Sequence, residues 1–491
     1  MIRGPAAVVA VTAVICPAAV LLAALGGVGV GTVAVGVVAL GALVVLGVLR
    51  GPEELGVLLL LAAVGTAPWN AVSVAGIKLA PALLLGATAL LAVPVLAGRT
   101  PLRMRPWVVV LGGSIALVAV LTWFLPPDGA YFASRYVGDG AFASPPISEV
   151  GGISAVQGLQ WLVAAVVLPV VVAAACHGRL WLVARLADAW TLGASISAGV
   201  AVTDELGLSH LSAAILPYVD VGGRQAGLSV QPNHVAVAAA ITVPWAVWRL
   251  VRTGPVAPRV AAAVCLGADA GGLVVSASRG ALVGAVLAAL AVLLCSARTR
   301  RLALALLGAA ALAVVLALAA VPALLGDVGE RLRFADAASA DASDAVRAGI
   351  GAQAWQDFLV SPLHGIGLEV ALQGHDIYLQ LLASGGALLL LGFLAALVLL
   401  GVDVRTLLRH PDPAVPPGLV AALALAVATW LVVCSIENHL TDLFLYVPLA
   451  LLAALRAAVP ADDPEPLPAR AAPAPDAPAV LAAAAAEGPR A

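Results

Sequence analysis

Residues 378–400 read YLQLLASGGALLLLGFLAALVLL, and this stretch contains no charged side chain. It is longer than the about 20 residues that an α-helix needs to cross the roughly 30 Å hydrocarbon core of a bilayer. The stretch therefore predicts a membrane-spanning helix. Similar apolar stretches recur along the chain, separated by short segments that carry Arg, Pro or Gly.

The composition agrees with a membrane protein that crosses the bilayer many times. Hydrophobic residues make up 62% of the chain, charged residues only 11%, and the mean hydropathy is +1.07. We predict an all-α, polytopic membrane helix bundle of about fourteen transmembrane helices over residues 1–459. The expected spans are 5–25, 27–49, 55–75, 77–97, 107–125, 158–176, 186–203, 233–251, 260–276, 280–297, 302–325, 378–400, 419–435 and 443–459.

The distribution of positive charge predicts the orientation. Cytoplasmic loops collect Lys and Arg, and assigning alternate loops to opposite sides places most of the 25 basic residues inside when both termini are cytoplasmic. We expect a multi-pass protein of the cytoplasmic membrane, with no polybasic segment for nucleic acid. The basic residues that fall instead in or beside outward segments are Lys78, Arg135, Arg224, Arg279, Arg331, Arg333 and Arg347.

Three outward segments are long enough to form extracytoplasmic loops: 126–157, 204–232 and 326–377. The last of these lies before the third-from-last span and has a helical pattern. Residues 460–491 are rich in Pro, Ala and acidic residues without apolar periodicity, which predicts a disordered cytoplasmic tail.

Two polar stretches interrupt the apolar pattern. In GGRQAGLSVQPNHVAVAAA, residues 222–240, Arg224 lies in a Gly-rich turn and Asn233 falls where a helix is expected to start, so that Asn233 could simply be its N-cap. In LVVSASRGALVGAVLAAL, residues 273–290, Arg279 lies in a very short turn. A charge so near hydrocarbon must be paired, hydrated or bound to an anion; the alternative is an arginine that extends to the interface.

The third polar stretch, residues 341–391, is the richest in chemistry. Arg347 and Trp355 share a face of a predicted amphipathic helix that Pro362 ends, and a loop leads from there to His375. Histidine is suited to accept a proton near neutral pH, although His375 could also be an ordinary interfacial residue. No histidine falls in a metal-binding spacing such as HExxH, so no metal or cofactor is expected.

Together these stretches resemble the O-antigen ligase and polysaccharide polymerase family of membrane proteins over residues 222–391. Members have an arginine before a PN at a helix start, an SRG turn, and an outer loop with P-x-x-G-x-G and HN-x-Y-L-Q. Where they have HN, this chain has His375 followed by Asp376, and an aspartate can cap a helix as an asparagine does. The matching residues are Arg224, Pro232, Asn233, Ser278, Arg279, Gly280, Arg347, Trp355, Pro362, Gly365, Gly367, His375, Tyr378, Leu379 and Gln380.

The resemblance implies a metal-independent, inverting glycosyltransferase without a cofactor. Its donor would be an oligosaccharide on undecaprenyl diphosphate, and its acceptor a hydroxyl of a glycan, lipid or protein at the outer face of the membrane. His375, Arg279 and Arg347 would be catalytic. The residues expected to bind substrate are Arg224, Lys78, Asn233, Trp355, Tyr378, Gln380 and Asp376.

Two other functions compete with this one. A transporter of a small solute or ion would use intramembrane polar residues such as Asp269 and Lys78. A cell-wall glycan polymerase would use the same type of donor. The clustering of polar groups at the outer edge favours interfacial chemistry over transport.

Overall fold

The computed structural model describes residues 51–74, 77–134, 146–215, 224–295, 299–301, 304, 337–371, 375–437 and 439–458. The predicted spans 5–25 and 27–49, nearly all of 302–325, and the tail 460–491 lie outside these residues, as do Arg135, Arg331 and Arg333.

The described part of the chain is mostly helical, as predicted. A short π-helical segment, Val163–Val167, joins α7 to α8 without a break, and a two-residue hairpin, β1 (Ser73–Val74) with β2 (Ile77–Lys78), lies between α3 and α4. The helices are α3 (Pro52–Thr66), α4 (Leu79–Leu96), α5 (Pro106–Phe124), α6 (Gly129–Ser134), α7 (Ile147–Leu162), α8 (Leu168–Cys176), α9 (Trp181–Glu205), α10 (Leu211–Ile215), α11 (Pro232–Val251), α12 (Val256–Val275), α13 (Arg279–Cys295), α16 (Ala337–Val360), α17 (Ile377–Arg409), α18 (Leu419–Val433) and α19 (Leu443–Ala458).

Six helices in the described residues are long and apolar enough to cross a membrane. Three further helices, α13, α18 and α19, are apolar but shorter. A membrane helix bundle is therefore the class of this protein, while the number of about fourteen spans stays a prediction. The six long helices are α4, α5, the continuous helix Ile147–Cys176, α11, α12 and α17.

Two expected spans have different ends in the structure. The span expected at 55–75 ends as α3 at Thr66, because Pro68 has no backbone N–H with which to continue the helical hydrogen bonds. The chain then turns into the hairpin, in which Ser73 pairs with Lys78. The helix expected to start at 158 starts instead at Ile147, so the last third of the segment 126–157, expected to be a loop, is helical.

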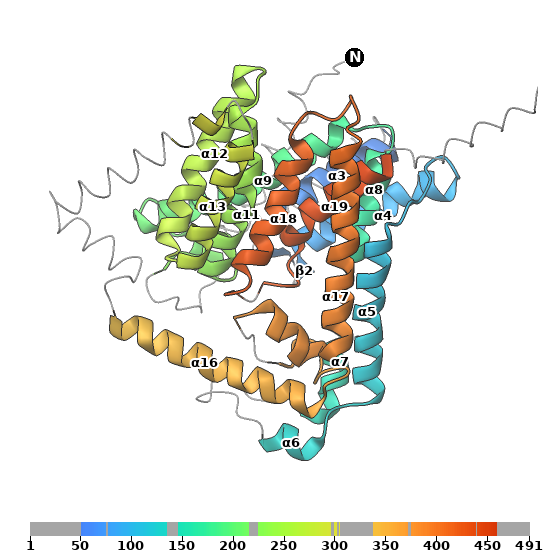
Figure 1. Cartoon of the computed structure of the whole chain (residues 1–491), viewed down its shortest axis with the longest axis vertical. Helices are drawn as coiled ribbons and strands as arrows, with labels where there is room; N and C mark the ends of the chain where they lie inside the picture. The colour runs from blue at the N-terminus through green and yellow to red at the C-terminus, as the bar shows by residue number, and fades with distance from the viewer. Residues whose placement is uncertain are drawn as a thin grey trace, which may run out of the picture. The chain divides into compact units, whose positions relative to one another are not determined.

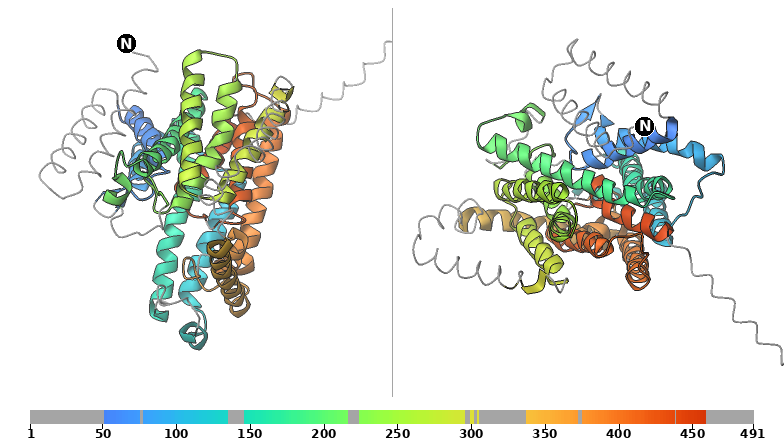
Figure 2. Two further views of the ribbon diagram at one scale, coloured as in Figure 1. Left: turned by 90° about the vertical axis from the view of Figure 1, so that its left-hand side faces the viewer. Right: turned by 90° about the horizontal axis from the view of Figure 1, so that it is seen from above.

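Helix α11 lies at the centre of the bundle. It contacts α9, α12, α13 and α18, and nearly every residue from Val235 to Trp248 is buried. Helix α19 is buried along almost its whole length as well. Figure 2 shows α11 among its neighbours from the side and from above. The first residues of a central helix are therefore well placed to organise a site.

Helix α16 runs crosswise to α17 (Figures 1 and 2). The buried Asp357 connects α16 to α6, because its carboxylate accepts a hydrogen bond from Tyr131 Oη (2.7 Å). Gln353 Nε2, one turn earlier in α16, donates to the same carboxylate (2.9 Å). The helix ends at Val360, as expected from Pro362. Its crosswise course is the one expected of a helix lying along a membrane surface.

The polar contacts of the long helices lie near the helix ends, and those at one end differ from those at the other. At one end Arg105 Nε donates to Asp403 Oδ2 (3.0 Å), and Arg249 Nε donates to Asp188 Oδ1 (2.8 Å). At the opposite end of α11 lies Asn233, and at the opposite end of α17 lies His375. These two contacts therefore lie at the ends of α17 and α11 opposite to His375 and Asn233; how the chain crosses the membrane and which end faces the cytoplasm stay predictions.

Candidate functional site

Arg224 connects two of the three polar stretches. Its Nε donates to the backbone carbonyl of Ser276 (2.7 Å), three residues before Arg279, and its terminal nitrogen donates to Asn233 Oδ1. The helix α11 begins at Pro232 with Gln231 as its N-cap, so the expected capping role of Asn233 is wrong. The side-chain amide of Asn233 instead bridges Arg224 and Glu437.

Glu437, in the loop between α18 and α19, joins the third stretch to the other two. Its Oε2 accepts a hydrogen bond from Asn233 Nδ2 (2.7 Å) and lies 3.9 Å from His375 Nδ1. His375 is held there because the next but one residue, Ile377, donates its N–H to the carbonyl of Cys434 (3.0 Å). We call Arg224, Asn233, Glu437, His375 and Arg347 the Glu437 cluster.

The cluster carries positive charge around one buried carboxylate. Burial acts to raise the pKa of Glu437, but the approach of His375 and the charges of His439, His375 and Arg347 outweigh it, and the pKa lies below its ordinary value. Glu437 is therefore ionised at neutral pH and holds the cationic side chains in place.

This lowered pKa predicts how stability responds to acid. A carboxyl group whose pKa is lowered by folding stabilises the protein above its unfolded pKa, and this contribution is lost as the pH falls through the folded pKa. We expect the thermal unfolding midpoint of the detergent-solubilised protein to fall on acidification from about pH 5 to about pH 3, and to fall less in Glu437→Gln. The exposed Glu149→Gln serves as control and should respond like wild type. Equal losses in Glu437→Gln and wild type would contradict this assignment.

Backbone strain marks the same region. The non-glycine residues with positive φ in the described chain are Ala277 (52°), Glu369 (61°) and His375 (50°). Such conformations cost free energy and concentrate at functional sites. Ala277 lies in the turn before Arg279, His375 belongs to the Glu437 cluster, and Glu369 lines the cavity described below.

Asp376 caps α17, as predicted. Its Oδ1 accepts hydrogen bonds from the backbone N–H groups of Tyr378 (2.8 Å) and Leu379 (3.3 Å). Asp376→Ala should lower the free energy of unfolding by about 1 kcal/mol, because two N–H groups lose their acceptor, whereas Asp376→Asn should retain most of it. Denaturant unfolding of the two variants beside wild type measures the difference; an equal loss in both would point to charge rather than capping.

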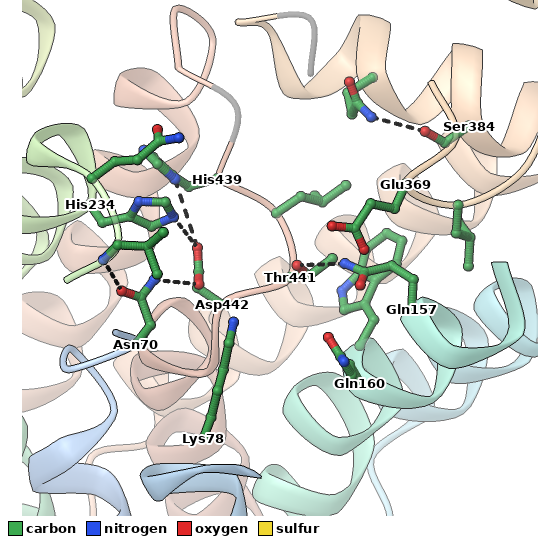
Figure 3. Close-up of a pocket in the computed structure, with 16 residues that line it drawn as sticks. Asn70, Lys78, Gln157, Gln160, His234, Glu369, Ser384, His439, Thr441 and Asp442 are labelled. Carbon is green, nitrogen blue, oxygen red and sulfur yellow. Dashed lines mark hydrogen bonds and ion pairs between the residues drawn. The ribbon is translucent and has the colours of Figure 1, made fainter. Parts of the chain in front are cut away.

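A polar cavity of about 220 Å³ lies beside the cluster. Figure 3 shows side chains from β2, α7, α11, α17 and the 437–442 loop around it. Lys78 and Gln380, both expected to bind substrate, line it. Gln380 Nε2 also donates to Ser384 Oγ (3.0 Å). The other polar side chains in its wall are Asn70, Gln157, Gln160, Gln231, His234, Glu369, Ser384, His439, Thr441 and Asp442.

One wall of this cavity holds two imidazoles and a carboxylate. His234 Nε2 lies 3.1 Å from Asp442 Oδ2, His439 Nδ1 lies 3.7 Å from the same oxygen, and the two ring centroids are 4.1 Å apart. Burial and then the charge of His234 lower the pKa of His439, against the opposing effect of Asp442. Burial acts to raise the pKa of Asp442, but His234 and His439 hold it well below its usual range.

The remaining predicted site residues lie near the cluster or apart from it. Arg279 is half-buried in the first turn of α13, which packs on the Glu437 loop: a Cβ at Gly280 would lie 2.1 Å from Ile436 Cδ1. Tyr378 is half-buried in the first turn of α17. Trp355 is 47% exposed, its ring lies tilted against that of Phe358 (centroids 5.3 Å apart), and it does not line the cavity.

Sequence reasoning missed the 437–442 loop. Glu437, His439 and Asp442 lie in the stretch SIENHLTD, residues 435–442, between two apolar spans on the same predicted side as His375. Titratable residues so dense in such a short turn were a usable signal. Asn70 gave no comparable signal, because a single amide between apolar segments is ordinary.

No protein-family model matches this chain, and a search of the curated proteins found no significant match. The functional assignment therefore depends on the residues and their geometry.

Proposed function

We propose that this membrane protein is a glycosyltransferase of the O-antigen ligase and polymerase type. It would move an oligosaccharide from undecaprenyl diphosphate to an acceptor hydroxyl at the outer face of the cytoplasmic membrane. The observation that carries the proposal is the Glu437 cluster beside a polar cavity. Glu437 accepts a hydrogen bond from Asn233, which Arg224 holds, and it lies 3.9 Å from His375 and within the electrostatic influence of Arg347.

The cationic groups suit a diphosphate leaving group. Arginine offers planar, paired N–H donors to phosphate oxygens and keeps its charge at any physiological pH. Arg279 and Arg347 would bind the diphosphate and stabilise the charge that develops as the glycosidic C–O bond breaks. Arg224, already bonded to Ser276 and Asn233, would hold these segments in register. The transfer step itself would then need no metal ion at the diphosphate.

His375 is the proposed base. If the Nδ1 that lies 3.9 Å from Glu437 Oε2 carries the proton, a neutral imidazole has its lone pair at Nε2. That nitrogen would take the proton of the acceptor hydroxyl as the oxygen attacks the anomeric carbon, while the diphosphate leaves from the opposite face. The configuration of the sugar is then inverted. The 3.9 Å separation of His375 from Glu437 would shorten when substrate binds, as often occurs in catalytic pairs.

The cavity has the chemistry of a sugar site. Its amide, hydroxyl and carboxylate groups can donate to and accept from sugar hydroxyls, and its volume is about 220 Å³. This is enough for one sugar ring. Transport, the alternative function, gains less support: Asp269 is buried in α12 beside the hydroxyls of Thr242 in α11 (3.4 Å) and Ser195 in α9, which is one small polar group rather than a pathway.

The test is reconstitution of the full chain in liposomes with an undecaprenyl-diphosphate-linked glycan and a panel of glycan, lipid and peptide acceptors. We expect release of undecaprenyl diphosphate and a glycoside of inverted configuration by NMR. A product of retained configuration would exclude the single-displacement mechanism. Solute counterflow without consumption of any lipid-linked donor would favour transport.

A further inference from the structure

His234, His439 and Asp442 form a group that the proposed transfer mechanism does not use. His234 lies in the first turn of α11, and the other two lie in the loop before α19. One potential ligand atom from each of these residues lies within 4.8 Å of the other two. The group borders the polar cavity (Figure 3) but lies outside the Glu437 cluster.

His439 lacks the hydrogen bonds that a buried imidazole requires. Its side chain is 2% exposed. Its Nδ1 faces Asp442 Oδ2 at 3.7 Å, which is beyond hydrogen-bond length, and this is the nitrogen that an ion beside Asp442 would engage; its Nε2, on the other side of the ring, has no partner among the described residues. Buried polar atoms are nearly always paired, and an unpaired one in a native fold calls for a missing water or ion. A single Asp442 oxygen faces both imidazoles, so that one carboxylate does not satisfy the two rings.

The separations of these atoms suit a tetrahedral metal ion. Zinc binds imidazole nitrogen at about 2.0–2.1 Å and carboxylate oxygen at about 2.0–2.2 Å, which places neighbouring ligand atoms roughly 3.3–3.5 Å apart. The two measured separations from Asp442 Oδ2, 3.1 Å and 3.7 Å, lie on either side of this value. Small side-chain rotations would bring the imidazole nitrogens to the same spacing.

Asn70 holds the carboxylate as an outer partner of a metal ligand would. Its Nδ2 donates to Asp442 Oδ1 (2.9 Å), the oxygen that does not face the imidazoles, and its own Oδ1 accepts from the backbone N–H of Val230 (2.9 Å). These two bonds fix the orientation of the amide and direct Asp442 Oδ2 toward both histidines. Such outer contacts commonly tune metal affinity.

We propose that His234, His439 and Asp442 bind one divalent transition-metal ion, with zinc favoured, and leave its fourth coordination position open to the polar cavity. Two imidazoles with one carboxylate favour zinc over magnesium or calcium, which prefer oxygen ligands. The ion would connect the start of α11 to the loop before α19. This proposal does not rest on glycosyl transfer, because it requires no glycan and uses none of the diphosphate-binding arginines.

The test uses the full chain, purified in detergent without a histidine tag and stripped with a chelator. Added Co²⁺ should give the visible absorption of a tetrahedral site, and Zn²⁺ should bind at one ion per chain and raise the unfolding temperature. His234→Ala and Asp442→Ala should lose these signals. Asn70→Ala, which leaves the ligands in place, should weaken Zn²⁺ binding by about 10–100-fold.

His364→Ala is the matched control, because His364 contacts Ser361 (3.4 Å) and lies outside the group. It should bind Co²⁺ and Zn²⁺ like wild type. No tetrahedral Co²⁺ spectrum in wild type, or equal binding in wild type and Asp442→Ala, would overturn the proposal. Both readouts are independent of turnover, so an inactive but metal-binding protein would count only against the proposed function.

Discussion

His375→Ala should lower the rate of glycan transfer by about 10²- to 10⁴-fold, the range that a positioned general base contributes. The loss should appear in kcat, because His375 accepts the proton of the acceptor hydroxyl in the transition state. It does not bind the diphosphate, which provides most of the affinity for the donor. Initial rates in donor-containing liposomes, over a range of donor concentrations, measure both kcat and KM. Folding should survive, because His375 is half-buried and the Asp376 cap remains.

His410→Ala is the matched control for this prediction. His410 lies just beyond the opposite end of α17, at its C-cap, and is exposed. It should transfer glycan at the wild-type rate. A second comparison separates the roles: Arg279→Ala should lose donor affinity as well as rate, whereas Arg259→Ala, half-buried in the first turn of α12, should lose neither. Undiminished kcat in His375→Ala would remove this residue from the mechanism.

The helices were largely predictable, because in a membrane protein the apolar length alone defines a span. Helix α11, at Pro232–Val251, and α18, at Leu419–Val433, begin and end within two residues of the expected spans. The predicted start of a helix was wrong where no long apolar stretch marked it. Residues 147–157 contain Ser, Glu, Gly and Gln, so that hydropathy hides a helix whose buried positions Val150 and Ser154 are spaced by one turn.

The sequence predicted the charged residues of the site but not the residue that connects them. Arg224, Arg279, Arg347 and His375 stand out because a charge on the outer side contradicts the bias of the chain. In the structure His375 lies 3.9 Å from Glu437, Arg347 acts on the same carboxylate through its charge, and Arg224 reaches it through Asn233. Their common partner could not be read in advance. Contacts such as Asn233 with Glu437, which are 204 residues apart, depend on how helices pack and not on any local pattern.

Two glycines also show that a local pattern predicts a turn but not what the turn contacts. Gly365 and Gly367 in the loop after α16 predict a tight turn from their sequence alone, and both have positive φ. What the turn contacts is a property of the fold: a Cβ at Gly365 would lie 2.3 Å from the backbone carbonyl carbon of Ser384. The turn is inserted against a break in α17, at the SGG segment 384–386.

Gly386→Ala should therefore lower the free energy of unfolding by at least about 2 kcal/mol. Gly386 has φ 60° and ψ −162°, a region that essentially only glycine occupies. An added Cβ would also lie 2.4 Å from the carbonyl carbon of Leu363. Relief of that overlap would strain the backbone hydrogen bonds that join the broken helix to the loop, from Ala387 to Pro362 (2.8 Å) and from Leu388 to Leu363 (3.1 Å).

The control for this variant lies on the same helix. Gly401 has open space around its missing Cβ, so Gly401→Ala should leave stability unchanged or raise it by up to about 1 kcal/mol through helix propensity. Denaturant unfolding in one detergent compares both variants with wild type. Because the same loop leads on to Glu369 in the cavity wall, Gly386→Ala should also reduce glycan transfer in the protein that remains folded, whereas Gly401→Ala should not. A Gly386→Ala protein as stable as Gly401→Ala would mean that the loop does not lock the break in α17.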